Sequence, residues 1–103
     1  MERKVTYMQS IDVWYMIVTE KELDEDGDVA FKSYIDGIWD NYDTALSYIK
    51  AVRDNFRNDS DYDKVRDERF FVGSGFIDYD IAVGTYAYEF KVRKKIVTIS
   101  SKD

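Results

Sequence analysis

The sequence contains no cysteine and no histidine. Without cysteine there is no disulfide, no thiolate metal site and no cysteine nucleophile. Without histidine the chain lacks the commonest general base and the commonest transition-metal ligand, and no Ser-His or Cys-His pair exists. Long apolar runs are also missing, since the longest, residues 13–18, is too short to span a membrane. These absences argue against most enzyme classes and predict no metal, no cofactor and no membrane association.

The N-terminus shows no signal-peptide pattern, so we expect a cytoplasmic protein. At 103 residues the chain should form one domain, residues 1–103. Its hydrophobic content of 45% is typical of a globular protein. Aromatic residues make up 17%, including nine tyrosines, which is an ample supply of semi-polar side chains for a core and an interface.

Charge is distributed unevenly along the chain. Residues 20–80 hold seventeen Asp and Glu against eight Lys and Arg, a local net charge of -9. Residues 89–103 reverse the sign, with five basic residues against two acidic ones, and the whole chain carries -6. Because no cluster of residues indicates a reaction, this polarised surface is the strongest functional signal, and it points to partners rather than chemistry.

The apolar pattern predicts one helix and four strands. Apolar residues recur at helical spacing from Tyr42 to Phe56, directly after Asn41, a good N-cap. Strands are predicted over residues 11–20, 29–39, 70–83 and 86–99, with a solvated loop over residues 58–68 that includes a short helical turn near Tyr62. The fold class is therefore α+β: a single antiparallel sheet of about four strands in ββαββ order, with one amphipathic helix packed on one face.

Details within these strands can also be predicted. The first strand is apolar at both parities, so we expect it to be central and buried on both faces. Gly37 suggests a bulge or a close backbone approach. The segment Gly73-Ser74-Gly75 should bend the third strand, and the break in apolar parity at Lys94-Lys95 suggests a bulge or a separate short strand after it.

The last hairpin has a register that can be worked out on paper, taking Gly84-Thr85 as a two-residue turn. One face then pairs Val83 with Tyr86, Ile81 with Tyr88, Tyr79 with Phe90, and Ile77 with Val92, all apolar or aromatic. The other face pairs Ala82 with Ala87, Asp80 with Glu89, Asp78 with Lys91, and Phe76 with Arg93. A slip of one residue would destroy this sorting.

Three charged motifs have a functional and a plain interpretation. The segment Glu22-x-Asp24-x-Asp26-Gly27 resembles the start of an EF-hand calcium loop, but its first ligand is Glu and its last position lacks the bidentate Glu, so we interpret it as a hairpin loop. Asp78 and Asp80 share a strand face at a spacing of about 7 Å, which would suit acid–base work, although no pocket is implied. The basic residues after position 90 could contact phosphates, but lysines also protect sheet edges.

Two acidic loops carry the functional prediction. Their residues, with one tyrosine among them, are the candidate partner-binding site: Asp24, Glu25, Asp26, Asp28, Asp59, Asp61, Tyr62 and Asp63. An acidic surface with exposed aromatics suits docking on a basic groove, such as the nucleic-acid channel of an enzyme. Tyr34 is a second possible anchor. The plain alternative is that the acids only solubilise the domain.

In size, charge and lack of catalytic residues the chain resembles small acidic phage-type anti-defence inhibitors, including anti-CRISPR and anti-restriction proteins. The resemblance implies a non-enzymatic inhibitor whose acidic loops occupy a basic, nucleic-acid-binding surface of a target enzyme, with no direct nucleic-acid binding of its own. Two alternatives remain open. One is a structural protein that forms a homodimer through an edge strand such as residues 92–99; the other is an enzyme that uses carboxylates alone.

Overall fold

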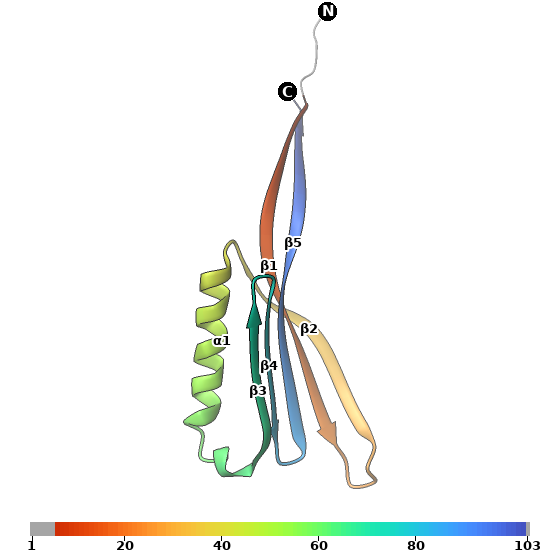
Figure 1. Cartoon of the computed structure of the whole chain (residues 1–103). Helices are drawn as coiled ribbons and strands as arrows, with labels where there is room; N and C mark the ends of the chain where they lie inside the picture. Colours follow the sequence, from red (N-terminus) through yellow and green to blue (C-terminus); the bar gives the residue numbers. More distant parts are fainter. Residues whose placement is uncertain (1–5, 103) are drawn as a thin grey trace, which may run out of the picture.

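The structure, a computed structural model, describes residues 6–102. Its elements are β1 (Thr6–Leu23), β2 (Val29–Trp39), α1 (Tyr42–Arg57), the 3₁₀ turn η1 (Tyr62–Lys64), β3 (Val65–Gly73), β4 (Phe76–Val83) and β5 (Tyr86–Lys102). The five strands form one antiparallel sheet in the order β2-β1-β5-β4-β3. The helix α1 connects the two opposite edge strands and therefore lies across one face of the sheet (Figure 1).

The helix begins and packs as its sequence predicts. Asn41 caps it, since its side-chain oxygen accepts the Thr44 backbone N–H at 2.8 Å. Ala45 and Ile49 are fully buried against the sheet. The core lies between α1 and this face, called here the helix face, and comprises Trp14, Met16, Val18, Ala45, Ile49, Ile77, Tyr79, Ile81, Phe90 and Val92. The opposite face, called the open face, has no helix over it.

The prediction of about four strands in ββαββ order is wrong, because the segment predicted as one bent strand is two strands. Gly73 pairs with Phe76 and Val72 with Ile77, so Ser74 and Gly75 form a turn rather than a bend. A Cβ on Gly73 would lie 2.3 Å from the Phe76 ring, and glycine lets that ring approach. Residues 65–68, predicted as loop, belong to β3. They are mostly charged because β3 is an edge strand, and this concealed the strand pattern.

The last hairpin has the predicted register at every pair from Val83–Tyr86 to Phe76–Arg93. Gly84, at a φ of +58°, makes the tight turn possible. The predicted bulge or strand break at Lys94-Lys95 is wrong: β5 pairs with β1 without interruption through both residues. The two lysines interrupt the apolar alternation of the sequence, but the backbone pairing of β5 with β1 continues through them.

Strand β1 has a neighbour on each side, as predicted, but only one of its faces is fully buried. Met16 on the helix face is 0% exposed, whereas Tyr15 and Ile17 on the open face are half-buried. The expected irregularity at Gly37 is confirmed. The β1–β2 register shifts there, and a Cβ on Gly37 would lie 2.3 Å from the Trp39 ring.

Strands β1 and β5 continue well past their neighbours. Pairing with β2 and β4 stops at Trp14–Trp39 and at Phe76–Arg93, while β1 and β5 stay paired to Thr6–Lys102. The result is a two-stranded ribbon that projects from the sheet and makes the molecule 71 Å long (Figure 1). The segment 92–99, the predicted edge, lies in this ribbon: β1 covers one side, and from Lys94 onward no described strand covers the other.

Candidate functional site

The two acidic loops lie at the same end of the sheet, opposite the ribbon (Figure 1). Loop 24–28 joins β1 to β2, and segment 58–64 joins α1 to β3. Both are bonded to the β4–β5 turn between them: the Leu23 N–H donates to the Thr85 carbonyl at 2.9 Å, and the Gly84 N–H donates to the Lys64 carbonyl at 3.1 Å. All eight predicted site residues are therefore at one end of the molecule, called here the acidic end.

Two of the acids shape the loops. The Oδ1 atom of Asp24 accepts the backbone N–H groups of Asp26 and Asp28, at 3.0 and 2.8 Å. Asp59 Oδ1 accepts the Asp61 N–H at 2.8 Å. Side-chain oxygens that satisfy loop N–H groups in this way stabilise tight turns. The remaining carboxylates of the two loops can then face solvent on a defined backbone.

The lysines near this end are already ion-paired. Lys64 contacts Asp61 at 3.3 Å, Lys32 contacts Glu20 at 3.0 Å, and Lys21 contacts Glu89 at 3.0 Å. Among the described residues, the acids here without an ion-pair partner are Glu22, Asp24, Glu25, Asp26, Asp28, Asp59 and Asp63. The acidic end therefore keeps a concentrated negative charge.

An aromatic groove runs between the two loops on the helix face. One hollow of about 240 Å³ and a second of about 340 Å³ share Tyr86 and Tyr88 in their lining. The two rings are stacked, with centroids 6.5 Å apart and planes inclined by 15°. The other groove residues are Phe56, Asp59, Asp61, Tyr62 and Val83 on one side, and Glu20, Lys21, Glu22, Ala30, Phe31 and Lys32 on the other. We call this the tyrosine groove.

The groove exists because α1 ends before it reaches the acidic end of β5. The sixteen helical residues extend about 24 Å. The helix ends over Tyr88, whose ring lies 5.4 Å from that of Phe56, and Tyr86 beyond it remains 46% exposed. Burial, together with the charges of nearby Glu20 and Glu22, raises the pKa of Tyr88, so this ring stays uncharged at neutral pH.

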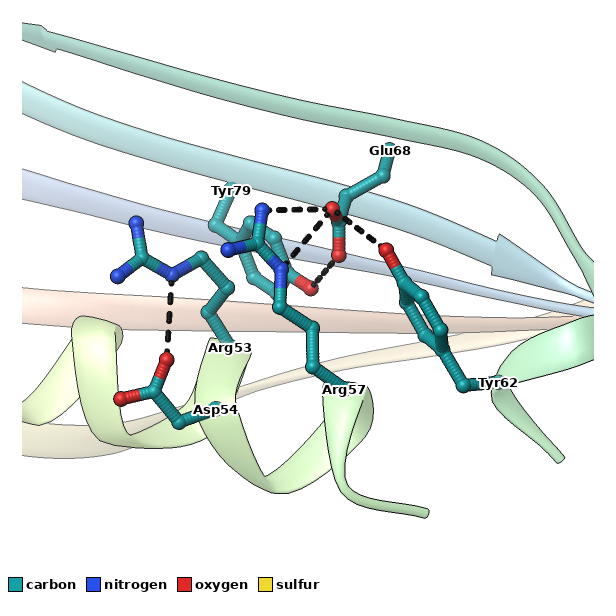
Figure 2. A network of polar contacts seen from close by, with 6 residues as sticks. All are labelled: Arg53, Asp54, Arg57, Tyr62, Glu68 and Tyr79. Carbon is teal, nitrogen blue, oxygen red and sulfur yellow. Dashed lines mark hydrogen bonds and ion pairs between the residues drawn. The ribbon is translucent and has the colours of Figure 1, made fainter. Parts of the chain in front are cut away.

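A partly buried polar network fixes one wall of the groove. Figure 2 shows Arg57, Tyr62 and Tyr79 converging on the carboxylate of Glu68. Arg57 Nη2 donates to Oε1 at 2.9 Å, Tyr62 donates to the same oxygen at 3.4 Å, and Tyr79, itself fully buried, donates to Oε2 at 2.7 Å. Burial alone would raise the pKa of Glu68, but these hydrogen bonds outweigh it and lower the pKa.

This network changes the role predicted for Tyr62. Its hydroxyl is tied inward to Glu68, and its ring, 37% exposed, forms part of the groove wall. Tyr34, the other predicted anchor, lies on β2 under Lys32, whose Nζ is 5.7 Å from the ring centroid, and it does not line the groove.

The site predicted from the sequence lacks the groove residues Phe56, Tyr86 and Tyr88, and also Glu68. A signal for the tyrosines was present in the predicted register, which placed them on the same face as the apolar residues of the core. Glu68 had no such signal, since it fell in the segment predicted as loop.

The carboxylate pair Asp78 and Asp80 lies on the open face. Arg93 holds Asp78 through contacts of 2.7 and 3.4 Å, replacing the expected role of Lys91. Asp80 faces Glu89, and burial followed by the charges of Glu89 and Asp78 raises its pKa. Asp78 is thus ion-paired, whereas Asp80 lies next to two other carboxylates. Both residues lie on the face of the sheet opposite the tyrosine groove.

Comparison with protein-family models, curated proteins and solved structures finds no match to this chain. No helix within residues 6–102 is both long and apolar enough to cross a membrane. In the same part of the chain no three acidic side chains lie close enough together to hold a metal ion. In the calcium-like motif of loop 24–28, the Asp24 carboxylate instead accepts backbone N–H groups of the loop itself.

Proposed function

We propose that this protein is a non-enzymatic binding domain whose acidic end engages a basic surface of a protein partner. The observation that carries the proposal is that both acidic loops lie at the end of the sheet that holds the tyrosine groove, where Asp59 and Asp61 line one side of the groove and Glu20 and Glu22 line the other. Carboxylates around an aromatic floor suit a Lys or Arg side chain, because the charged head meets the acids while the stem and the cation lie against the rings.

The partner class that fits best is an enzyme with a nucleic-acid-binding channel. Lys and Arg residues that normally hold phosphates would bind the carboxylates of the acidic end, and the protein would act as a competitive inhibitor. This is the mode of action expected from the resemblance to phage-type anti-defence inhibitors. Such a target places the action of the protein in the cytoplasm, and no direct contact with nucleic acid or membrane is needed.

The test begins with affinity capture from lysate of the source cell and its host, at low and high salt, with DNA or RNA as competitor. Each captured nucleic-acid enzyme is then purified and its dissociation constant measured. Because partly exposed ion pairs are screened by salt, binding should weaken as salt rises and nucleic acid should compete.

Matched variants separate the acidic end from net charge. Reversing Glu25, Asp26 and Asp28 to Lys should weaken binding by at least about tenfold, since several complementary charges become repulsive. The control reverses three acids elsewhere: Asp12, Asp40 and Asp54. Equal affinities for the two triple variants, or no effect from either, would contradict the proposal.

The groove has its own pair of variants. Tyr86→Ala should weaken binding by about tenfold, as expected for an aromatic anchor, with little effect on folding because the ring is exposed. Tyr48→Ala, an exposed tyrosine on α1, is the control. If both substitutions leave the dissociation constant unchanged, the groove is not part of the interface.

A further inference from the structure

Strand β2 is the less protected of the two edge strands, with one exposed lysine, Lys32, and one irregularity near Gly37. The sheet order leaves β2 and β3 at the two edges. Strand β3 carries four consecutive charged residues, 66–69, which discourage pairing with another chain. Strand β2 is eleven residues long, and its open-face side chains are large, apolar and well exposed: Val29 57%, Phe31 71%, Ile35 61% and Ile38 67%. A long edge of this kind is a template for strand pairing.

We propose that a second copy of this chain pairs with β2, antiparallel, about a two-fold axis at Ser33. In this register Phe31 lies opposite Ile35 of the second copy, and Ile35 lies opposite its Phe31. Aromatic and β-branched side chains form a favourable cross-strand pair. Val29 and Ile38 continue the apolar strip to either side, so the same strand supplies both halves of the contact, as a two-fold interface requires.

Neighbouring registers are less favourable. An axis at Lys32 would place the two lysines directly opposite each other, which is repulsive. An axis at Tyr34 would place Phe31 opposite Gly37 and Ile35 opposite Ser33, so both apolar pairs would be lost. An axis midway between two residues would place each open-face residue of one copy opposite a helix-face residue of the other, because side chains alternate along a strand. The apolar side chains of the two copies would then lie on opposite faces of the joint sheet.

Charge complementarity supports the same register. Lys32 would lie opposite Tyr34 of the second copy and diagonal to its Asp36 and its Lys32, at about 7–8 Å between backbone positions, within reach of a lysine side chain. The Lys32 side chain is 72% exposed, contacts Glu20 at 3.0 Å and lies over Tyr34 of its own chain. The two-fold axis repeats the Lys32–Asp36 pair, so each dimer would contain two attractive pairs against a single Lys32–Lys32 contact.

The resulting ten-stranded sheet would carry both helices on one face and a continuous apolar strip on the other. Because the paired strands are antiparallel, the two acidic ends would point in opposite directions. The second copy would lie beside Ala30, Phe31 and Lys32, which line one side of the tyrosine groove, whereas Tyr86, Tyr88 and the other side lie on other elements. Self-association and partner binding share this one side, but each has its own measurement, so either proposal can fail without the other.

The test uses sedimentation equilibrium of the full chain over a concentration series up to about 1 mM, the limit of weak specific association. The wild-type chain should show a monomer–dimer equilibrium. Lys32→Glu sets a carboxylate diagonal to Asp36 of the second copy, and Asp36→Lys sets an ammonium group diagonal to its Lys32. Each variant alone should dimerise at least about tenfold more weakly, because two pairs per dimer become repulsive.

An equimolar mixture of the two variants decides the question. In the mixed dimer both diagonal pairs have opposite charges again, so dimerisation should return, and this rescue shows that both variants are folded. The control Lys50→Glu, on the exposed face of α1, should neither weaken the wild-type dimer nor rescue Asp36→Lys. A wild-type monomer throughout the series, or a dimer that the variants leave unchanged or that mixing does not rescue, overturns the proposal.

Discussion

Replacing Asp80 with Asn should stabilise the protein at neutral pH. Asp80 lies on the open face directly opposite Glu89, and its Oδ1 atom is buried without a hydrogen-bond partner among the described residues. No ion pair neutralises Asp80 among the described residues, and the nearby charges of Lys91 and Arg69 offset the rise of its pKa only in part. Lys21 pairs with Glu89, and Arg69, opposite Asp80 on β3, pairs with Asp67 at 3.2 Å. The substitution removes the charge and keeps the shape.

The magnitude follows from two terms. Like charges directly opposite in a sheet destabilise by about 0.2–1 kcal/mol. Partial burial of a carboxylate oxygen without a donor adds a cost of the same order, reduced here because the side chain is partly solvated. Together they predict that Asp80→Asn raises the free energy of unfolding by about 1 kcal/mol, which corresponds to a rise in Tm of about 5 °C for a domain of this size.

The pH dependence has a definite sign. Burial and the charges of Glu89 and Asp78 raise the pKa of Asp80 above its ordinary value of 3.8, so the folded state holds this proton more tightly than the unfolded state. The carboxyl is therefore harmless below about pH 3.8 and destabilising once the pH exceeds its folded-state pKa. The gain from Asp80→Asn should be full at pH 7 and should largely disappear at pH 3.

The assay is urea unfolding followed by circular dichroism at both pH values. Asp67→Asn is the control, since it changes an aspartate on the same face that already has an ion-pair partner; it should alter stability by no more than about 0.5 kcal/mol. A loss of stability in Asp80→Asn at pH 7, or a gain that is the same at pH 3, would refute the reasoning.

Four further predictions concern the core, the polar network around Glu68 and one turn. Ile49→Ala should lower the free energy of unfolding by about 2–5 kcal/mol in urea titration, because the side chain is fully buried and leaves a cavity. Tyr79→Phe should cost about 1–3 kcal/mol by the same measurement, since its hydroxyl donates to the Glu68 carboxylate. The lowered pKa of Glu68 contributes stability above its ordinary value of 4.5 that is lost as the pH falls through the folded pKa; Glu68→Gln should flatten this acid-side loss in a pH series. Gly84→Ala should lower Tm by several degrees, because a φ of +58° costs about 1–2 kcal/mol for a residue with a Cβ.

The elements that the sequence predicts well are those whose signals are local. Apolar spacing and the Asn41 cap locate α1 correctly from Tyr42 to Arg57. The β4–β5 register follows from side-chain parity, because a slip of one residue would move every apolar side chain to the other face. Both signals depend only on residues near one another in the chain.

The errors arose where charge concealed a strand. Strand β3 is nearly half charged because it lies at an edge, and Lys94-Lys95 breaks the apolar parity of β5 without disturbing its pairing. Solvent accepts polar side chains on an exposed edge or ribbon, so the alternation that identifies a half-buried strand is weak there. The strand count was therefore wrong even though most of the pairing was right.

By itself the sequence determined the helix, the last hairpin and the existence of two acidic loops, because these depend on local periodicity and composition. Only the tertiary structure decided that the loops share one end, since this depends on the sheet order β2-β1-β5-β4-β3 and on contacts between the Gly84-Thr85 turn and both neighbours. It also decided that Tyr86 remains accessible and that β2 is an exposed edge. A helix that ends before the end of the sheet leaves part of a face uncovered, and strand order arises from long-range pairing that no short stretch of sequence encodes.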